Sequence, residues 1–474
     1  MPSPHGKYMK KLWESVNNMK RLFSVMVRST ALIISVVLLL PAAVVFAEGE
    51  NDEIVRPEPE GAPYIYFYNF ENDRVLYEKG DGSLSLYPAA TVKIMAGICA
   101  IEALGDDRLR EITVTDDMLS QASGNKIGFQ AGEIVTAEEM LYCMLVNSAN
   151  DAAVILSYIV SGSVDAFVSL MNDKAFELGA RSTTYTNPTG MHDDGMRTTL
   201  DDTVKIAKYA YGIPYFMEIV GTQKYVMEET NLSSYRNIYN RNCLMSKYYR
   251  PDYYYEQAIG MNAGSTSQAG YSVVAVARNA EGTLTYLCVI MGAEALDGDG
   301  TDDEKVLCNY KGAVELFDWA MKAFGYREVL SVQTTVCEVP VSLSSTADYV
   351  TLVPSKSVTV YLPTDVDISR EVSVKSSTEE DVRAPVRRGD VLGQARVMLG
   401  DEEIGRVDLI ATSDVTRSEF LFALERIREF TSGRFFIATV AAAVILTVIY
   451  VLIKAHLRQR RLRSRLPRRP SGRR

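Results

Sequence analysis

The chain has 474 residues, 47% of them hydrophobic, which is enough for more than one domain with a core of its own. Its formal net charge is −10, and residues 29–453 alone hold 34 Lys and Arg against 59 Asp and Glu, a net charge of about −25 that argues against a nucleic-acid partner. Only His192 of the three histidines lies away from the chain ends, so we expect no metal site, no cofactor and no Ser-His-Asp triad.

The N-terminal segment has the pattern of an export signal. Residues 1–28 are basic and polar, and residues 31–47 form an apolar run that ends in Val45-Phe46-Ala47. Small residues at the −3 and −1 positions are typical of a signal-peptidase site. We therefore expect residues 1–47 to be a signal peptide or a signal anchor, followed by an acidic, proline-containing linker at 48–61.

Residues 62–325 are predicted to form a domain of mixed strands and helices. Polar residues between 64–68 and 74–77 indicate a β-hairpin, and Thr136-Ala137-Glu138-Glu139 has the pattern of a capping box before a buried helix at 140–146. The other expected elements are helices at 90–104, 151–159, 164–178, 200–210 and 305–324 and strands at 271–277 and 284–291. Strands that precede and follow a run of helices indicate a sheet covered by helices, of the α/β or α+β class.

The chain changes character after this domain. Short β-prone segments at 339–343, 349–353, 358–362 and 372–374 are separated by turns, which predicts a small all-β domain at 328–412. Residues 415–434 are then expected to form an amphipathic stalk.

The C-terminal end is predicted to cross a membrane. Residues 435–453 are uncharged and mostly apolar, long enough for a bilayer core of roughly 30 Å. Residues 454–474 carry ten Lys and Arg and no acid, which favours a cytoplasmic stop signal over a nucleic-acid patch. Both basic ends are thus expected in the cytoplasm and the acidic middle outside the plasma membrane.

The six cysteines all lie in the acidic middle, without C-x-x-C spacing. An oxidising exterior permits disulfides. Because several of these cysteines stand inside apolar runs, such as Cys288 in 287–290, we favour buried free thiols over bridges.

The run Tyr87-Pro88-Ala89-Ala90-Thr91-Val92-Lys93 has the spacing of a serine acyl-transferase helix without its serine. In Ser-x-x-Lys enzymes the nucleophile stands three residues before the lysine, so that both side chains share one helical face. Ala90 occupies that position and has no nucleophilic atom. Thr91 stands two residues before Lys93, about 200° around a helix, and is a poor replacement.

With its further motifs, the chain resembles the serine-type D-alanyl-D-alanine carboxypeptidases, the low-molecular-weight penicillin-binding proteins of bacterial cell walls. The resemblance covers about residues 62–412. The motifs that carry it are 88–95, Ser148-Ala149-Asn150, 162–167, Asn187-Pro188-Thr189-Gly190-Met191, Gly260-Met261-Asn262-Ala263-Gly264 and 384–393. It implies a domain of the serine β-lactamase and penicillin-binding-protein type, followed by a β domain and a C-terminal transmembrane helix.

The resemblance also implies roles for single residues. In this family a serine attacks the terminal D-Ala-D-Ala bond, a lysine handles its proton, and a Ser-x-Asn motif assists. Lys93, Ser148 and Asn150 match these positions, whereas the nucleophile position holds Ala90. A Lys-Thr-Gly strand binds the substrate's carboxylate, and here the substrate-binding positions are Asn262, Ala263 and Gly264.

These departures predict a catalytically inactive member that binds peptidoglycan stem peptides or a wall-assembly protein at the plasma membrane of a bacterium. Removing the nucleophile of a serine hydrolase costs on the order of 10⁶ in turnover. Two alternatives remain open. One is an active carboxypeptidase that uses Thr91 or another nucleophile, and the other is an interaction scaffold with an empty pocket.

Each retained residue also has a structural interpretation. Ser148 and Asn150 can cap a turn between two helices, and Lys93 can be a buried structural lysine bonded to both of them. His192 is expected at the surface. The tyrosines at 248, 249 and 253–255 are expected to pack against the domain, the alternative being a platform for sugar rings.

Overall fold

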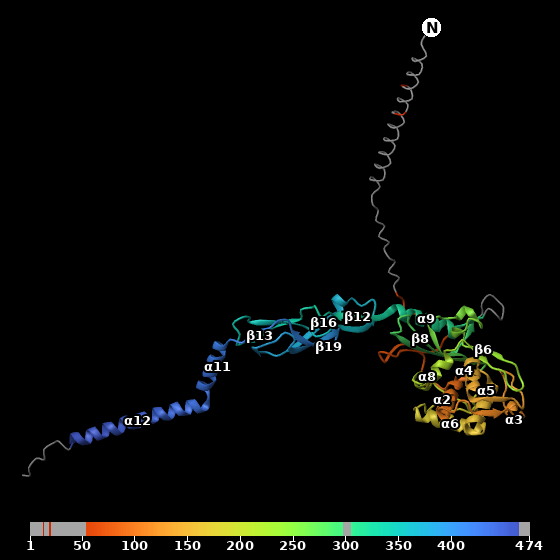
Figure 1. Ribbon diagram of the computed structural model, residues 1–474, viewed down its shortest axis with the longest axis horizontal. Coiled ribbons are helices and arrows are strands. Elements are labelled where there is room, and N and C mark those ends of the chain that lie inside the picture. The colour runs from red at the N-terminus through yellow and green to blue at the C-terminus, as the bar shows by residue number, and fades with distance from the viewer. Residues whose placement is uncertain (1–12, 14–18, 20–53, 297–304, 464–474) are drawn as a thin grey trace, which may run out of the picture. The chain divides into compact units, whose positions relative to one another are not determined.

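The computed structural model describes residues 54–296 and 305–463, together with Trp13 and Met19 (Figure 1). The expected signal segment at 1–47, apart from those two residues, and the end of the basic tail lie outside the described residues. Every element below belongs to the unit that spans residues 57–474.

A five-stranded antiparallel sheet organises the first domain, in the order β2-β1-β9-β8-β7. Its strands are β1 (Tyr64–Asn69), β2 (Arg74–Lys79), β7 (Ala258–Thr266), β8 (Gly270–Arg278) and β9 (Thr285–Ala293). The expected hairpin is β1–β2, and the two strands expected near residues 271–291 are β8 and β9. β7 is an edge strand, paired with β8 in a register that sets Gly264 opposite Ser272.

Helices cover both faces of this sheet, as the pattern predicted, and each face has its own core (Figure 1). One face packs against α2 (Val92–Leu104), α4 (Ala137–Asn147), α5 (Asn150–Ser161), α6 (Val164–Glu177), α7 (Leu200–Tyr211) and α8 (Pro214–Val220). The opposite face packs against α9 (Cys308–Ala323) through residues such as Phe67, Tyr286 and Phe317. The capping box is confirmed, since Thr136 accepts the N–H of Glu139 and Glu139 accepts that of Thr136.

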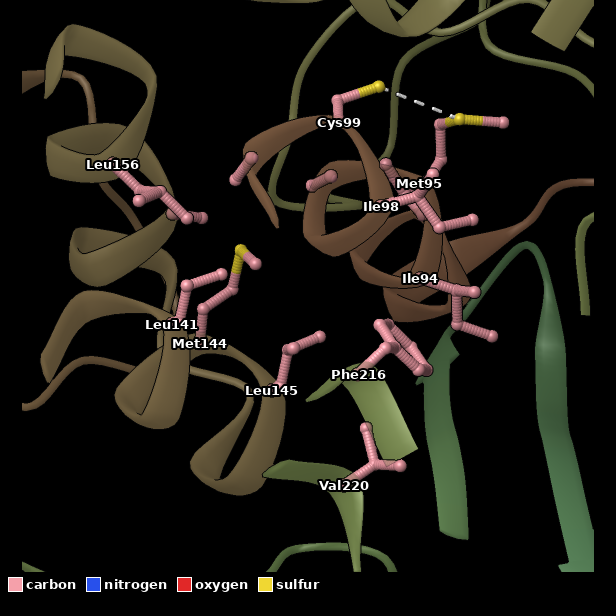
Figure 2. Packing of buried hydrophobic residues seen from close by; sticks show 14 of the residues in the cluster. Ile94, Met95, Ile98, Cys99, Leu141, Met144, Leu145, Leu156, Phe216 and Val220 are labelled. Atoms are coloured by element: carbon pink, nitrogen blue, oxygen red, sulfur yellow. Dashed lines mark hydrogen bonds between the residues drawn. The ribbon is translucent and has the colours of Figure 1, made fainter. Parts of the chain in front are cut away.

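Apolar side chains from several helices pack together at the centre of the helical layer. Figure 2 shows Ile94, Met95 and Ile98 of α2 beside side chains of α4, α5 and α8. At Gly97 an added Cβ would lie 3.0 Å from the side chains of Leu145 and Phe216, so α2 packs closely there. This close packing sets the position of α2, which carries Lys93 of the first motif near its start.

Several short elements were not predicted, because they span too few residues to show a period. They are α3 (Asp116–Ser120), β3 (Glu111–Thr113), β4 (Ile134–Thr136), β5 (Lys224–Met227), β6 (Arg236–Tyr239), β10 (Ala295–Leu296), β11 (Val306–Leu307) and the 3₁₀ turns η1 (Ala89–Thr91), η2 (Cys243–Met245) and η3 (Pro251–Tyr253). All six cysteines are free thiols, as favoured from the sequence, and all but Cys337 are buried.

The C-terminal β domain contains a two-stranded sheet, β12-β15, and a six-stranded sheet, β16-β18-β19-β14-β13-β17. The elements are β12 (Phe324–Leu330), β13 (Cys337–Ser342), β14 (Tyr349–Pro354), β15 (Val358–Pro363), α10 (Ile368–Glu371), β16 (Val372–Thr378), β17 (Val382–Arg383), β18 (Val391–Leu399) and β19 (Glu402–Ala411). A third hydrophobic cluster of valines, leucines and alanines fills it. The predicted β domain is therefore confirmed as an element of the fold.

Two helices follow, α11 (Glu419–Ser432) and α12 (Arg434–Arg463). Phe420, Leu424, Ile427 and Phe430 of α11 are exposed. Within α12, residues Arg434–Arg461 are long and apolar enough to cross a membrane, with a mean hydropathy of 2.8 over the most apolar window, none of it buried. In the described residues α5 and α6 also meet this criterion as a bent pair, but α5 belongs to the buried core of the first domain.

Candidate ligand-binding site

The first motif lies where the edge strand β7 meets the start of α2. Ala90 stands in the turn η1, so the helix expected at 90–104 begins with a tighter 3₁₀ turn. A Cβ added at Gly264 would lie 2.4 Å from the Cβ of Ala90, which no side chain could tolerate. Glycine at 264 therefore allows β7 to approach Ala90 this closely.

Thr91 is turned toward its own backbone. Its hydroxyl donates to the carbonyl of Pro88 at 2.6 Å, and the residue is only 6% exposed. Thr91 is not one of the described residues that line the cavity around Ala90. Its hydroxyl thus serves the turn that precedes α2.

Lys93 is buried, 1% exposed, and lines the cavity. Its ammonium nitrogen donates to Oδ1 of Asn150 at 2.8 Å and to the carbonyl of Thr189 at 2.5 Å. Burial without a carboxylate partner lowers the pKa of Lys93 to about 7. The expected contact with Asn150 is confirmed, but within the described chain Lys93 bonds Thr189 and not Ser148.

The second motif forms the link between α4 and α5. Ser148 ends α4 with a left-handed φ of 58°, lines the cavity, and makes no hydrogen bond through its hydroxyl to any described residue. Asn150 begins α5 and is 4% exposed, and its amide also donates to the carbonyl of Ser123 at 2.6 Å. Asn150 therefore ties Lys93 to a neighbouring loop, whereas Ser148 shows no capping bond of the kind considered from the sequence.

The third motif lies on β7. Ala263 and Gly264 line the cavity together with Ser265 and Thr266. Asn262 is 3% exposed, and its Oδ1 has no hydrogen-bond partner in the described part of the chain. The structure thus brings the three motifs to one cavity, which the order of the motifs alone did not establish.

The cavity has a volume of about 250 Å³. Its remaining wall comes from residues that the sequence did not single out as site residues, among them Arg241, Tyr271, Asn309 and Tyr310. No sequence signal pointed to Asn309, because it reaches the cavity through the first turn of α9. None of the described lining residues is an Asp or a Glu.

The tyrosine cluster divides in two. Tyr255 is buried and Tyr253 donates to the carbonyl of Lys305, as expected for a packed loop. Tyr248 and Tyr249 are 62% and 39% exposed, and Tyr249 lines the cavity. His192 is exposed, as predicted, and contacts Asp194.

Comparison with known proteins agrees with this geometry. The family described as D-alanyl-D-alanine carboxypeptidase matches residues 63–295, and the one described as penicillin-binding protein 5, C-terminal domain, matches residues 324–417. The chain is 26% identical over 413 residues to the D-alanyl-D-alanine carboxypeptidase DacF of Bacillus subtilis, covering 86% of this chain and 98% of that protein. It is 25% identical to DacC of Escherichia coli, covering 81% of this chain and 91% of that protein.

The chain belongs to the low-molecular-weight penicillin-binding proteins. Solved structures share its fold. Penicillin-binding protein 5 from Haemophilus influenzae superposes with a TM-score of 0.53 at 21% identity, covering 77% of this chain and all of that one. The carboxypeptidase DacD from Francisella tularensis gives 0.53 at 19% identity, with 78% and 97% covered.

In this penicillin-binding protein, Lys93, Asn150 and Gly264 match the residue types that the resemblance implies, whereas Ala90, Asn262 and Ala263 do not. Lys93, Asn150 and the glycine at 264 keep the contacts described above. Ala90, Asn262 and Ala263 remove a hydroxyl, an ammonium and a second hydroxyl from the positions that the resemblance assigns to them.

Proposed function

We propose that this penicillin-binding protein is anchored in the plasma membrane and binds peptidoglycan stem peptides without cleaving them. The observation that carries the proposal is Ala90, whose methyl group stands at the nucleophile position beside Gly264 and within reach of the cavity. Acyl transfer of this type requires a hydroxyl or thiol there to form the acyl-enzyme. A methyl group supplies neither.

The position of Thr91 supports the same conclusion. A hydroxyl that donates to Pro88 at 2.6 Å would have to break this bond and leave the turn in order to attack a substrate. Cys243 is the one cysteine among the described residues that line the cavity, and burial raises the pKa of its thiol, so a thiolate is disfavoured at neutral pH.

The cavity that remains is suited to binding. Lys93 bonds Asn150 and Thr189, and so joins α2 to the start of α5 and to the loop at 187–191. In the described part of the chain β7 is the edge strand of the sheet and its residues line the cavity, and an extended peptide can add to such an edge. We propose that Lys93 now maintains the shape of the pocket.

The membrane orientation is part of the proposal. α12 is the anchor, its basic end lies in the cytoplasm, and the two folded domains lie outside. The large negative charge of the middle of the chain is compatible with this placement.

The test measures both turnover and binding of stem peptides by the full chain in detergent micelles. We expect no release of D-alanine from a model stem peptide, but saturable binding of stem peptides in calorimetry. Ser265→Trp should abolish binding, because Ser265 is exposed and lines the cavity. Ser267→Trp, on the turn after β7 and outside the cavity lining, is the matched control. Steady release of D-alanine, or equal binding by both variants, would contradict the proposal.

A further inference from the structure

Two tyrosines beside the cavity are exposed, although buried groups hold the loop that carries them. Tyr248 and Tyr249 are 62% and 39% exposed. Their backbone N–H groups both donate to Oγ of Ser246, at 3.2 and 2.9 Å, and Ser246 is fully buried. The loop therefore fixes both residues in place while leaving them at the surface.

These tyrosines continue the cavity wall into an aromatic surface. Tyr249 and Arg241 line the cavity, and the Arg241 guanidinium lies 4.7 Å from the centre of the Tyr249 ring. Tyr248 is not among the described residues that line the cavity, and its ring centre lies 4.9 Å from that of Tyr239. We call Tyr239, Tyr248 and Tyr249 the tyrosine ledge. It begins at the cavity and extends beyond it.

Two hydrogen bonds join the base of the tyrosine ledge to the end of α4. The carbonyl of Tyr239 accepts from Nδ2 of Asn147 at 3.1 Å, and the backbone N–H of Arg241 donates to the carbonyl of Val146 at 2.9 Å. α4 leads directly into Ser148, which also lines the cavity. The position of the ledge is thus tied to that of the second motif.

Packing does not account for the two exposed tyrosines. Tyr255, from the same loop, is buried, and its hydroxyl donates to Asp318 at 2.9 Å. The hydroxyls of Tyr248 and Tyr249, by contrast, bond no residue in the described ranges 54–296 and 305–463. Exposed aromatic residues that gather beside a cavity are typical of a binding surface.

A sugar ring has a surface that complements such a ledge. One face of a pyranose presents C–H groups that pack on an aromatic ring, and its rim carries hydroxyls and, in acylated amino sugars, amide carbonyls. Tyrosine combines a flat apolar ring with a hydroxyl, and the exposed Arg241 guanidinium offers N–H donors to the rim.

An anionic polymer fits the ledge less well. Such a ligand is bound by clustered cations that are free to pair with it. Here Arg241 lies over the ring of Tyr249, and Lys224 lies 5.6 Å from the centre of the Tyr239 ring, so each cation already contacts an aromatic face. The surrounding domain also belongs to the strongly acidic middle of the chain.

We propose that the tyrosine ledge binds the sugar to which a stem peptide is attached, so that the protein recognises the peptide together with its glycan. This inference rests on the proposed function, because it places the peptide in the adjoining cavity. A peptide whose free end enters the cavity leaves its sugar-bearing end outside, where the ledge lies.

The experiment compares a stem peptide with the same peptide joined to its disaccharide, by calorimetry on the full chain in detergent micelles. We expect the sugar-bearing form to bind about tenfold more tightly, as contact with two aromatic rings would give. This advantage should persist at high salt, because contacts between a neutral sugar and aromatic rings are not screened.

Variants of single exposed tyrosines locate the effect. Tyr248→Ser should reduce the advantage of the sugar-bearing form to within about twofold and leave binding of the bare peptide unchanged, whereas Tyr248→Trp, which keeps an aromatic ring, should preserve the advantage. Tyr235→Ser is the matched control, because Tyr235 is 63% exposed and lies outside the ledge. It should change neither affinity.

The possible outcomes are distinct. Equal affinity for the two ligands, or an advantage that survives Tyr248→Ser, would overturn the inference while the proposed function stands. An advantage that disappears at high salt, or a glycerol-phosphate oligomer that competes for the ledge, would point to an anionic ligand and also overturn it. If neither ligand binds, the proposed function fails and the inference fails with it.

Discussion

Replacing Lys93 by methionine should stabilise the first domain at neutral pH. Lys93 is fully buried, has two neutral acceptors and no carboxylate partner, and has a pKa of about 7 instead of the usual 10.5. Folding therefore disfavours its charged form. Methionine has a similar length and no charge to bury.

The pH dependence of the free energy of unfolding gives the size of this effect. Between pH 7 and the ordinary lysine pKa, the unfolded chain holds a proton on Lys93 that the folded chain has released, so the free energy of unfolding rises with pH over this window. From pH 7 to pH 9 a pKa of about 7 corresponds to a rise of about 2 kcal/mol from this group. Below pH 7 Lys93 becomes protonated in the folded as well as in the unfolded chain, and the buried charge then destabilises the folded state to its full extent.

The methionine variant should lack this rise. At pH 7 the variant should also be more stable than the wild type by about 2 kcal/mol. It removes the cost of burying the lysine charge, and this cost exceeds the contribution of the two lost hydrogen bonds, about 1 kcal/mol each. Urea unfolding at the two pH values, followed by fluorescence of Trp319 in α9, measures both quantities. The other tryptophan, Trp13, is replaced by phenylalanine in both proteins.

Lys93→Gln is the matched control, since it is also uncharged but keeps a donor for Asn150. It should lose the pH dependence as the methionine variant does, and its gain in stability at pH 7 should be at least as large, because it loses one hydrogen bond where methionine loses two. Equal pH slopes in the wild type and both variants would show that Lys93 is not desolvated, and would refute the reasoning.

Three further predictions concern the turn, the strand contact and the topology. In an Ala90→Ser background, Thr91→Val should leave any penicillin acylation rate within about twofold and cost about 1 kcal/mol of stability from the lost bond to Pro88; a large rate loss would give Thr91 a chemical role. Gly264→Ala should lower the thermal midpoint by an amount equivalent to about 1–3 kcal/mol, because its Cβ would lie 2.4 Å from that of Ala90, and an unchanged midpoint would mean that β7 moves freely. Protease added outside wall-stripped cells should digest the folded domains and spare the tail after Lys454, and the reverse pattern would show an inverted orientation.

The sequence predicted the elements whose burial has a clear period. The hairpin β1–β2, the capped helix α4 and the apolar span in α12 all follow from local pattern, turn residues or capping chemistry. Spacing singled out Ala90 and Lys93, and the family resemblance added Ser148 and Asn262 as motif positions. The sequence therefore indicated which residues could form one site if the fold brought them together.

The rest depended on contacts between distant segments. The carbonyl of Thr189 accepts from Lys93 across a separation of 96 residues, and a backbone acceptor leaves no mark on residue identity. Asn309 looks like any polar residue at a helix start, and only the packing of α9 against β8 brings it to the cavity. Ser148 and Lys93 belong to motifs that line the same cavity, but in the described residues the lysine bonds Asn150 and Thr189 and not Ser148.

The central claim is that this penicillin-binding protein lacks a nucleophile because position 90 is alanine. The most direct measurement is covalent labelling of the full chain by a fluorescent penicillin, comparing the wild type with Ala90→Ser. The account predicts no adduct on the wild type and slow acylation of Ala90→Ser, mapped by mass spectrometry to residue 90, since the new hydroxyl would stand in the cavity one helical turn from Lys93. Stoichiometric labelling of the wild type, or a folded Ala90→Ser variant that still fails to acylate, would contradict it.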